Sequence, residues 1–75
     1  MSRGYMSDPV LADHRRRFAG HLLDIRQAQG WTSYRLAREI GIAPATLYAL
    51  IHEQAMAWPA TMAKVQALEE RLSNE

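Results

Sequence analysis

The chain has 75 residues, no cysteine and a formal net charge of +1. This length predicts one small domain. The lack of cysteine excludes a disulfide framework or a zinc–thiolate site, so stability must come from well-packed helices or from a partner chain. No apolar run is long enough for a membrane span and no leader-like segment opens the chain. We therefore expect a cytoplasmic protein without a membrane anchor.

A long helix is the first predicted element. Residues 1–8 are short and polar, and we expect them to form a flexible tail. Asp8 is a good N-cap, and Pro9 suits the first helical position, where its missing N–H costs nothing. Gly30 supplies the residue that ends a helix in the left-handed conformation. The sequence therefore predicts a helix over residues 9–29.

The apolar residues of this first helix recur at helical spacing. A break before Phe18 is an alternative, because residues 12–17 are polar on every side. Arg15, Arg16 and Arg17 form a basic run that either contacts phosphate or an acidic partner, or is a solvated face balanced by Asp13. The predicted apolar face consists of Leu11, Phe18, Leu22 and Ile25.

Residues 32–52 predict two short helices around a tight turn. Thr32 is an N-cap for the first of them, and Gly41 stands where the chain must leave that helix. Pro44 restarts a helix at its first position. The residue before it, Ala43, forgoes a side-chain cap worth about 1 kcal/mol. The two apolar faces comprise Leu36, Ala37 and Ile40, and then Leu47, Leu50 and Ile51.

Pro59 opens the last predicted helix, after a loop over residues 53–58. Trp58 is placed to pack on the core and fix the entry of the chain into this helix. Residues 73–75 are expected to fray. An apolar stripe at helical spacing comprises Met62, Val65, Leu68 and Leu72.

Two helices joined by a short turn that contains glycine form a helix-turn-helix pattern. Ala37 is small and stands four residues before Gly41, on the face where the two helices would cross. The pattern resembles the motif of the Cro/repressor-type (xenobiotic response element-like) helix-turn-helix family. The matching residues are Ala37, Gly41, Ile42, Leu47 and Leu50. An ordinary helical hairpin in a small bundle is the alternative interpretation.

The resemblance extends over residues 18–72, with the motif at 32–52, in a domain of residues 9–75. It implies an all-α, four-helix, lambda-repressor-like fold with an N-terminally extended first helix. Trp31 would fill the space between the first two helices. The family often pairs an arginine of the first helix with a glutamate; here Arg26 has no glutamate at the matching place and instead has Glu39, Glu53 or solvent as its alternatives.

The resemblance also implies a function. A homodimer would bind double-stranded operator DNA with the helix of residues 44–52 in the major groove. The protein would be a repressor or autoregulator of bacterial, phage or plasmid type, associated with the nucleoid. Thr32, Ser33, Tyr34, Arg35 and Arg38 are the expected contacts to the DNA backbone. Pro44, Ala45, Thr46, Tyr48, Ala49 and His52 are the expected groove contacts.

The groove set contains no Arg, Lys, Asn or Gln, which are the side chains that usually read bases. Readout would then depend on DNA shape and dimer spacing. A low-specificity accessory module for transposition or partition is a close alternative, and a protein-interaction module on the same scaffold is another. The sequence gives no nucleophile–base constellation, no metal spacing around His14, His21 or His52, and no sign of a cofactor or small-molecule ligand. We do not expect an enzyme.

Overall fold

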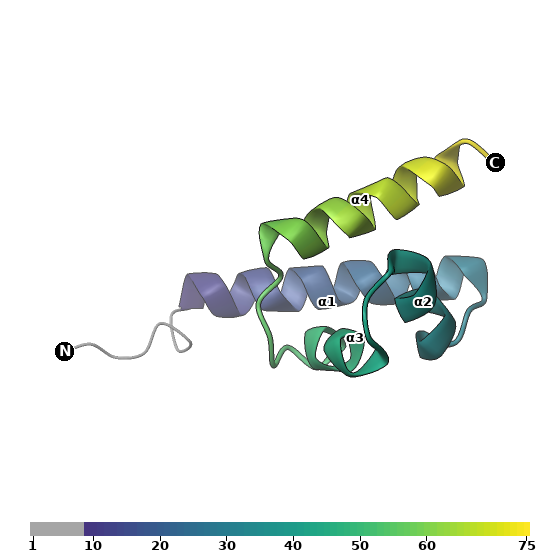
Figure 1. Cartoon of the computed structure of the whole chain (residues 1–75). Coiled ribbons are helices and arrows are strands. Elements are labelled where there is room, and N and C mark those ends of the chain that lie inside the picture. The colour runs from purple at the N-terminus through teal and green to yellow at the C-terminus, as the bar shows by residue number, and fades with distance from the viewer. Residues whose placement is uncertain (1–8) are drawn as a thin grey trace.

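The computed structural model describes residues 9–75, and this part of the chain is entirely helical apart from its connections. It contains four helices and no strand, which confirms the all-α prediction (Figure 1). The predicted tail of residues 1–8 and the Asp8 cap lie outside the described residues. The helices are α1 (Pro9–Gln29), α2 (Ser33–Ile40), α3 (Pro44–Ile51) and α4 (Pro59–Ser73).

Helix α1 is continuous over 21 residues, so the alternative of a break before Phe18 is wrong. Its core contacts come from the second half of the helix, where Leu22 and Ile25 are buried. The first turns extend past α3 and α4 (Figure 1), which explains why Leu11 is only half-buried and lies outside the core. Gly30 ends the helix with φ 68°, as predicted.

Helices α2 and α3 are eight residues each, and a tight turn joins them. Thr32 caps α2, since its hydroxyl accepts the N–H of Arg35 at 3.1 Å. Gly41 takes the left-handed conformation with φ 95° and donates its N–H to the carbonyl of Ala37. The N–H of Ile42 donates to the same carbonyl at 3.0 Å. These contacts reverse the chain within three residues of the start of α3.

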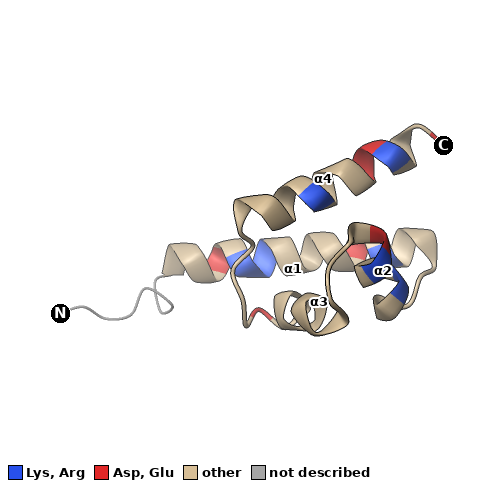
Figure 2. Cartoon of the chain, in the orientation of Figure 1, with Lys and Arg blue, Asp and Glu red and all other residues tan. Residues whose placement is uncertain are grey.

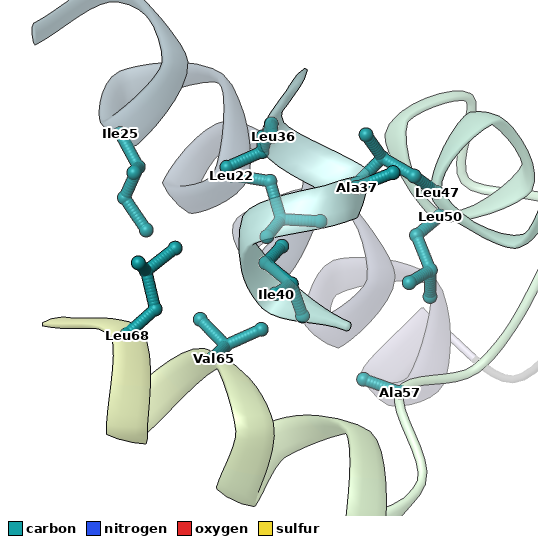
Figure 3. Close-up of a cluster of buried hydrophobic side chains, with 10 residues drawn as sticks. All are labelled: Leu22, Ile25, Leu36, Ala37, Ile40, Leu47, Leu50, Ala57, Val65 and Leu68. Carbon is teal, nitrogen blue, oxygen red and sulfur yellow. The ribbon is translucent and has the colours of Figure 1, made fainter. Parts of the chain in front are cut away.

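The core lies where α3 packs on α1 and α2, and where α2 packs on α4 (Figure 3). Leu22 of α1, Leu36 of α2 and Leu47 of α3 are its largest fully buried side chains. Ala37 is also fully buried, at 0% exposure. A larger side chain at this position would push α2 and α3 apart, which accounts for the small residue there.

Helix α4 contributes two buried residues, Val65 and Leu68, to the core. Leu72 packs against them, but Met62 at the start of the predicted stripe is 36% exposed. The prediction that Trp58 packs on the core is wrong, because its side chain is 67% exposed. Ala57 is buried in the core instead. The backbone is extended at Trp58, and successive side chains of an extended segment point to opposite sides, so Trp58 faces away from the core.

Polar contacts join α4 to the other helices. His21 of α1 lies 2.7 Å from Glu69, measured from Nε2 to Oε2. Lys64 donates its Nζ to the carbonyl of Gly41 at 3.3 Å, so α4 also touches the turn between α2 and α3. Among the four helices of residues 9–75, none combines the length and the hydropathy that a bilayer-spanning segment requires.

Two glycines should respond in opposite directions to replacement by alanine. Gly41→Ala should lower the free energy of unfolding by about 1–2 kcal/mol, because a Cβ is disfavoured at positive φ. Gly20→Ala should raise it by about 0.5–1 kcal/mol, since Gly20 is exposed in the middle of α1 and a Cβ there meets no atom within 4 Å. Urea unfolding followed by circular dichroism measures both. Stabilisation at both positions would contradict the left-handed end of α2.

Ala37→Leu should destabilise the chain by about 1–3 kcal/mol, because the added side chain has no room between α2 and α3. Ala63→Leu is the matched control, since Ala63 is exposed on α4. It should change stability by less than about 0.5 kcal/mol. Equal effects of the two substitutions in denaturant titrations would show that the helices do not cross closely at Ala37.

Candidate nucleic-acid interface

The N-terminus of α2 holds the residues expected to contact a nucleic-acid backbone. The Thr32 hydroxyl is already engaged in the helix cap. The Ser33 hydroxyl accepts a hydrogen bond from Arg26 Nη1 at 3.3 Å. Because the first amides of a helix have no partner within it, the backbone N–H groups of Ser33 and Tyr34 are the donors left for an anion. The hydroxyl groups of Thr32 and Ser33 are thus engaged within the fold, whereas the Tyr34 side chain is 64% exposed.

Arg26 corrects a second expectation. Its guanidinium reaches Ser33 rather than Glu39, Glu53 or solvent, and its Nε is buried without a hydrogen-bond partner. The contact links the last turn of α1 to the first turn of α2. Trp31 packs against the core between these helices, as predicted. Arg26 thus joins α1 to α2, a role that its position in the sequence did not indicate.

The two arginines of α2 differ in their surroundings. Arg35 lies over the Trp31 ring, with its Cζ 5.0 Å from the ring centroid. Its Nε donates to Glu39 Oε2 at 3.3 Å. Arg38 is exposed and forms no ion pair within residues 9–75. Arg35 lies in the first turn of α2, beside its free amides, whereas Arg38 lies in the last turn of the helix.

The outer face of α3 carries no charge (Figure 2). Tyr48 is 63% exposed, and the centroid of its ring lies 4.2 Å from the centroid of the His52 ring. Ala49 was expected on this face, but it is half-buried, because α3 packs on both α1 and α2 and so covers a wide part of its surface. The other groove candidates are exposed: Pro44, Ala45, Thr46, Tyr48 and His52.

Part of the basic run of α1 is neutralised by its own helix. Arg16 and Arg17 each lie 2.9 Å from the Asp13 carboxylate. Arg15 Nη1 approaches the Met56 sulfur at 3.7 Å. These contacts favour the interpretation as a balanced, partly solvated face. No group of three His, Cys, Asp or Glu residues that could hold a metal ion occurs in the part of the chain that the structure describes.

Sequence reasoning missed Glu39 and Arg71 at this surface. Glu39 Oε1 accepts from Arg71 Nη2 at 2.7 Å, which brings α4 beside the arginines of α2. The two residues are 32 positions apart, and no local pattern signals such a pair. No protein-family model, curated protein or solved structure matches the chain.

The start of α3 gives a prediction of its own. Ala43 occupies the N-cap with extended backbone angles and makes no side-chain hydrogen bond. Ala43→Ser should raise the free energy of unfolding by about 1 kcal/mol, because the hydroxyl can accept an otherwise unpaired amide of the first turn. Thermal melting measures the gain. Ala60→Ser, an exposed position within α4, is the control and should give no such gain. An unchanged melting temperature for Ala43→Ser would mean that α3 does not begin at Pro44.

Proposed function

We propose that the chain is a DNA-binding protein with a lambda-repressor-like helix-turn-helix domain, in which α3 enters the major groove. One observation carries the proposal: the outer face of α3 is exposed, and the helix that a tight turn joins to it, α2, carries Arg35 beside the free amides of its first turn and the exposed Arg38 in its last turn. A helix of eight residues is about 12 Å long, and the major groove of B-DNA admits a helix.

The turn between the two helices supports the same assignment. Ala37 is fully buried where α2 meets α3, and Gly41 is left-handed at the end of α2. This geometry fixes α2 and α3 as one rigid unit, which a reading helix needs because phosphate contacts on one helix must set the register of the other. We infer that α2 crosses the backbone while α3 lies in the groove.

The readout would depend on the shape of the DNA more than on base edges. The exposed residues of α3 offer methyl groups, one hydroxyl of Thr46, the phenol of Tyr48 and the imidazole of His52. Methyl groups can contact thymine, but bidentate hydrogen bonds to a base edge need Arg, Lys, Asn or Gln side chains, which α3 lacks. A homodimer on two half-sites would double the few contacts of one copy. We propose a role in transcriptional repression or autoregulation.

The test is fluorescence anisotropy of a labelled random duplex, titrated across salt concentrations. Affinity should fall linearly on a log–log plot, with a slope of about −0.9 for each phosphate neutralised. Arg35→Gln with Arg38→Gln should weaken binding and make the slope shallower by up to about 1.8 per chain. Arg16→Gln with Arg17→Gln removes the same charge from α1, where both side chains are exposed, and should leave the slope nearly unchanged.

Equal losses in the two double variants would show that only overall charge attracts the duplex. Absence of binding at low salt would reject the proposal. A protein-interaction module is then the better candidate, since the net charge is only +1 and the uncharged face of α3 exposes Tyr48. In that case pairing with the protein partner should survive the Arg35 and Arg38 substitutions.

A further inference from the structure

Glu39 is the point at which α2 and α4 share a charge network. Its carboxylate accepts from Arg35 Nε at 3.3 Å through one oxygen and from Arg71 Nη2 at 2.7 Å through the other. The Glu39 side chain is 23% exposed, whereas those of Arg35 and Arg71 are each 51% exposed. The carboxylate therefore lies deeper than the two guanidinium groups that it holds.

The network constrains Arg35 from two directions. Glu39 accepts from its Nε, and its Cζ lies over the Trp31 ring, 5.0 Å from the ring centroid. A guanidinium has five N–H donors in a fixed plane. With Nε engaged by Glu39, the donors of the two terminal Nη groups remain for a ligand at the far end of the guanidinium. Such an end-on pair of donors matches the oxygens of a phosphate group.

We propose that Glu39, itself held by Arg71, is a positioning residue that keeps Arg35 on Trp31 as a preformed phosphate-binding group. The inference rests on the proposed function for its ligand, the phosphodiester backbone of DNA, and assigns a role to two residues that do not themselves contact it. The link to Arg71 makes α4 part of the apparatus that orients α2 against the backbone.

A positioning role and simple charge repulsion predict opposite effects of Glu39→Gln on DNA affinity. A carboxylate near a phosphate repels it, so removing the charge of Glu39 should by itself strengthen DNA binding. A positioning role opposes that gain, because a released arginine must be ordered again when the phosphate binds, at a cost of about two- to tenfold in affinity. The two contributions separate when Glu39→Gln is introduced with and without Arg35.

The experiment is a double-variant cycle of Glu39→Gln and Arg35→Gln, with Kd for a random duplex measured by anisotropy at fixed salt. In the Arg35→Gln background, Glu39→Gln should raise affinity. With Arg35 present, the effect of Glu39→Gln should be about two- to tenfold less favourable. Arg71→Gln should likewise be coupled to Arg35. Arg16→Gln is the matched control, an exposed arginine paired with a carboxylate, and should act equally in both backgrounds.

A second readout is independent of DNA. Ring currents of Trp31 should shift the side-chain protons of Arg35 in the NMR spectrum, and Glu39→Gln should abolish most of that shift. Circular dichroism confirms that the variant is folded. An unchanged shift, or a cycle in which Glu39→Gln acts equally in both backgrounds, would overturn the inference while leaving the proposed function intact.

If the wild-type chain does not bind duplex DNA, inorganic phosphate titrated into the same NMR sample decides the matter. Saturable shifts of the Arg35 signals in the wild type, lost in Glu39→Gln, would reject the proposed function but keep a positioned anion site for free phosphoryl groups. Absence of any saturable shift would overturn both.

Discussion

The close contact of α2 and α3 at Ala37 is the constraint on which the rest of the structure depends. Helices of eight residues are not stable alone in water, so tertiary packing must hold them. Ala37 permits the contact because it has no side chain beyond Cβ, and Gly41 ends the helix four residues later. Leu22 of α1 then packs into the cluster that the two short helices create. Helix α1 thus supports the packed pair of α2 and α3.

The polar contacts of α4 join it to two other helices but add little to stability. Exposed ion pairs contribute at most about 1 kcal/mol each, and the groups that hold α4 are all partly exposed. Their value lies in direction: Glu69 meets His21 on α1, while Arg71 meets Glu39 on α2. A helix fixed to two neighbours at different points cannot rotate about its own axis without breaking one of the contacts. These polar contacts therefore act together with the buried Val65 and Leu68 to orient α4.

Local signals in the sequence were sufficient for the helices and their ends. Thr32 and Gly41 act through atoms within a few residues of themselves, so their effect can be predicted without knowing the fold. The pairing of Glu39 with Arg71 depends on how α4 crosses α2, which no local pattern encodes. Trp58 failed as a core residue for a related reason, since a neighbouring alanine took the inward position and only the packed structure decides between them. The candidate surface was predicted as a set of residues, but its network of contacts was not.

The small buried face of α4 has a consequence for the motions of the chain. Of its 15 residues only Val65 and Leu68 are buried, whereas α2 buries three of its eight. Segments with few buried apolar contacts open with the lowest free energy in hydrogen exchange. We therefore expect helix α4 to be the first cooperative unit to detach, with its amides exchanging before those of α2 and the second half of α1. Such an opening would expose Ile40 and Ile25, which Val65 and Leu68 of α4 cover in the folded chain.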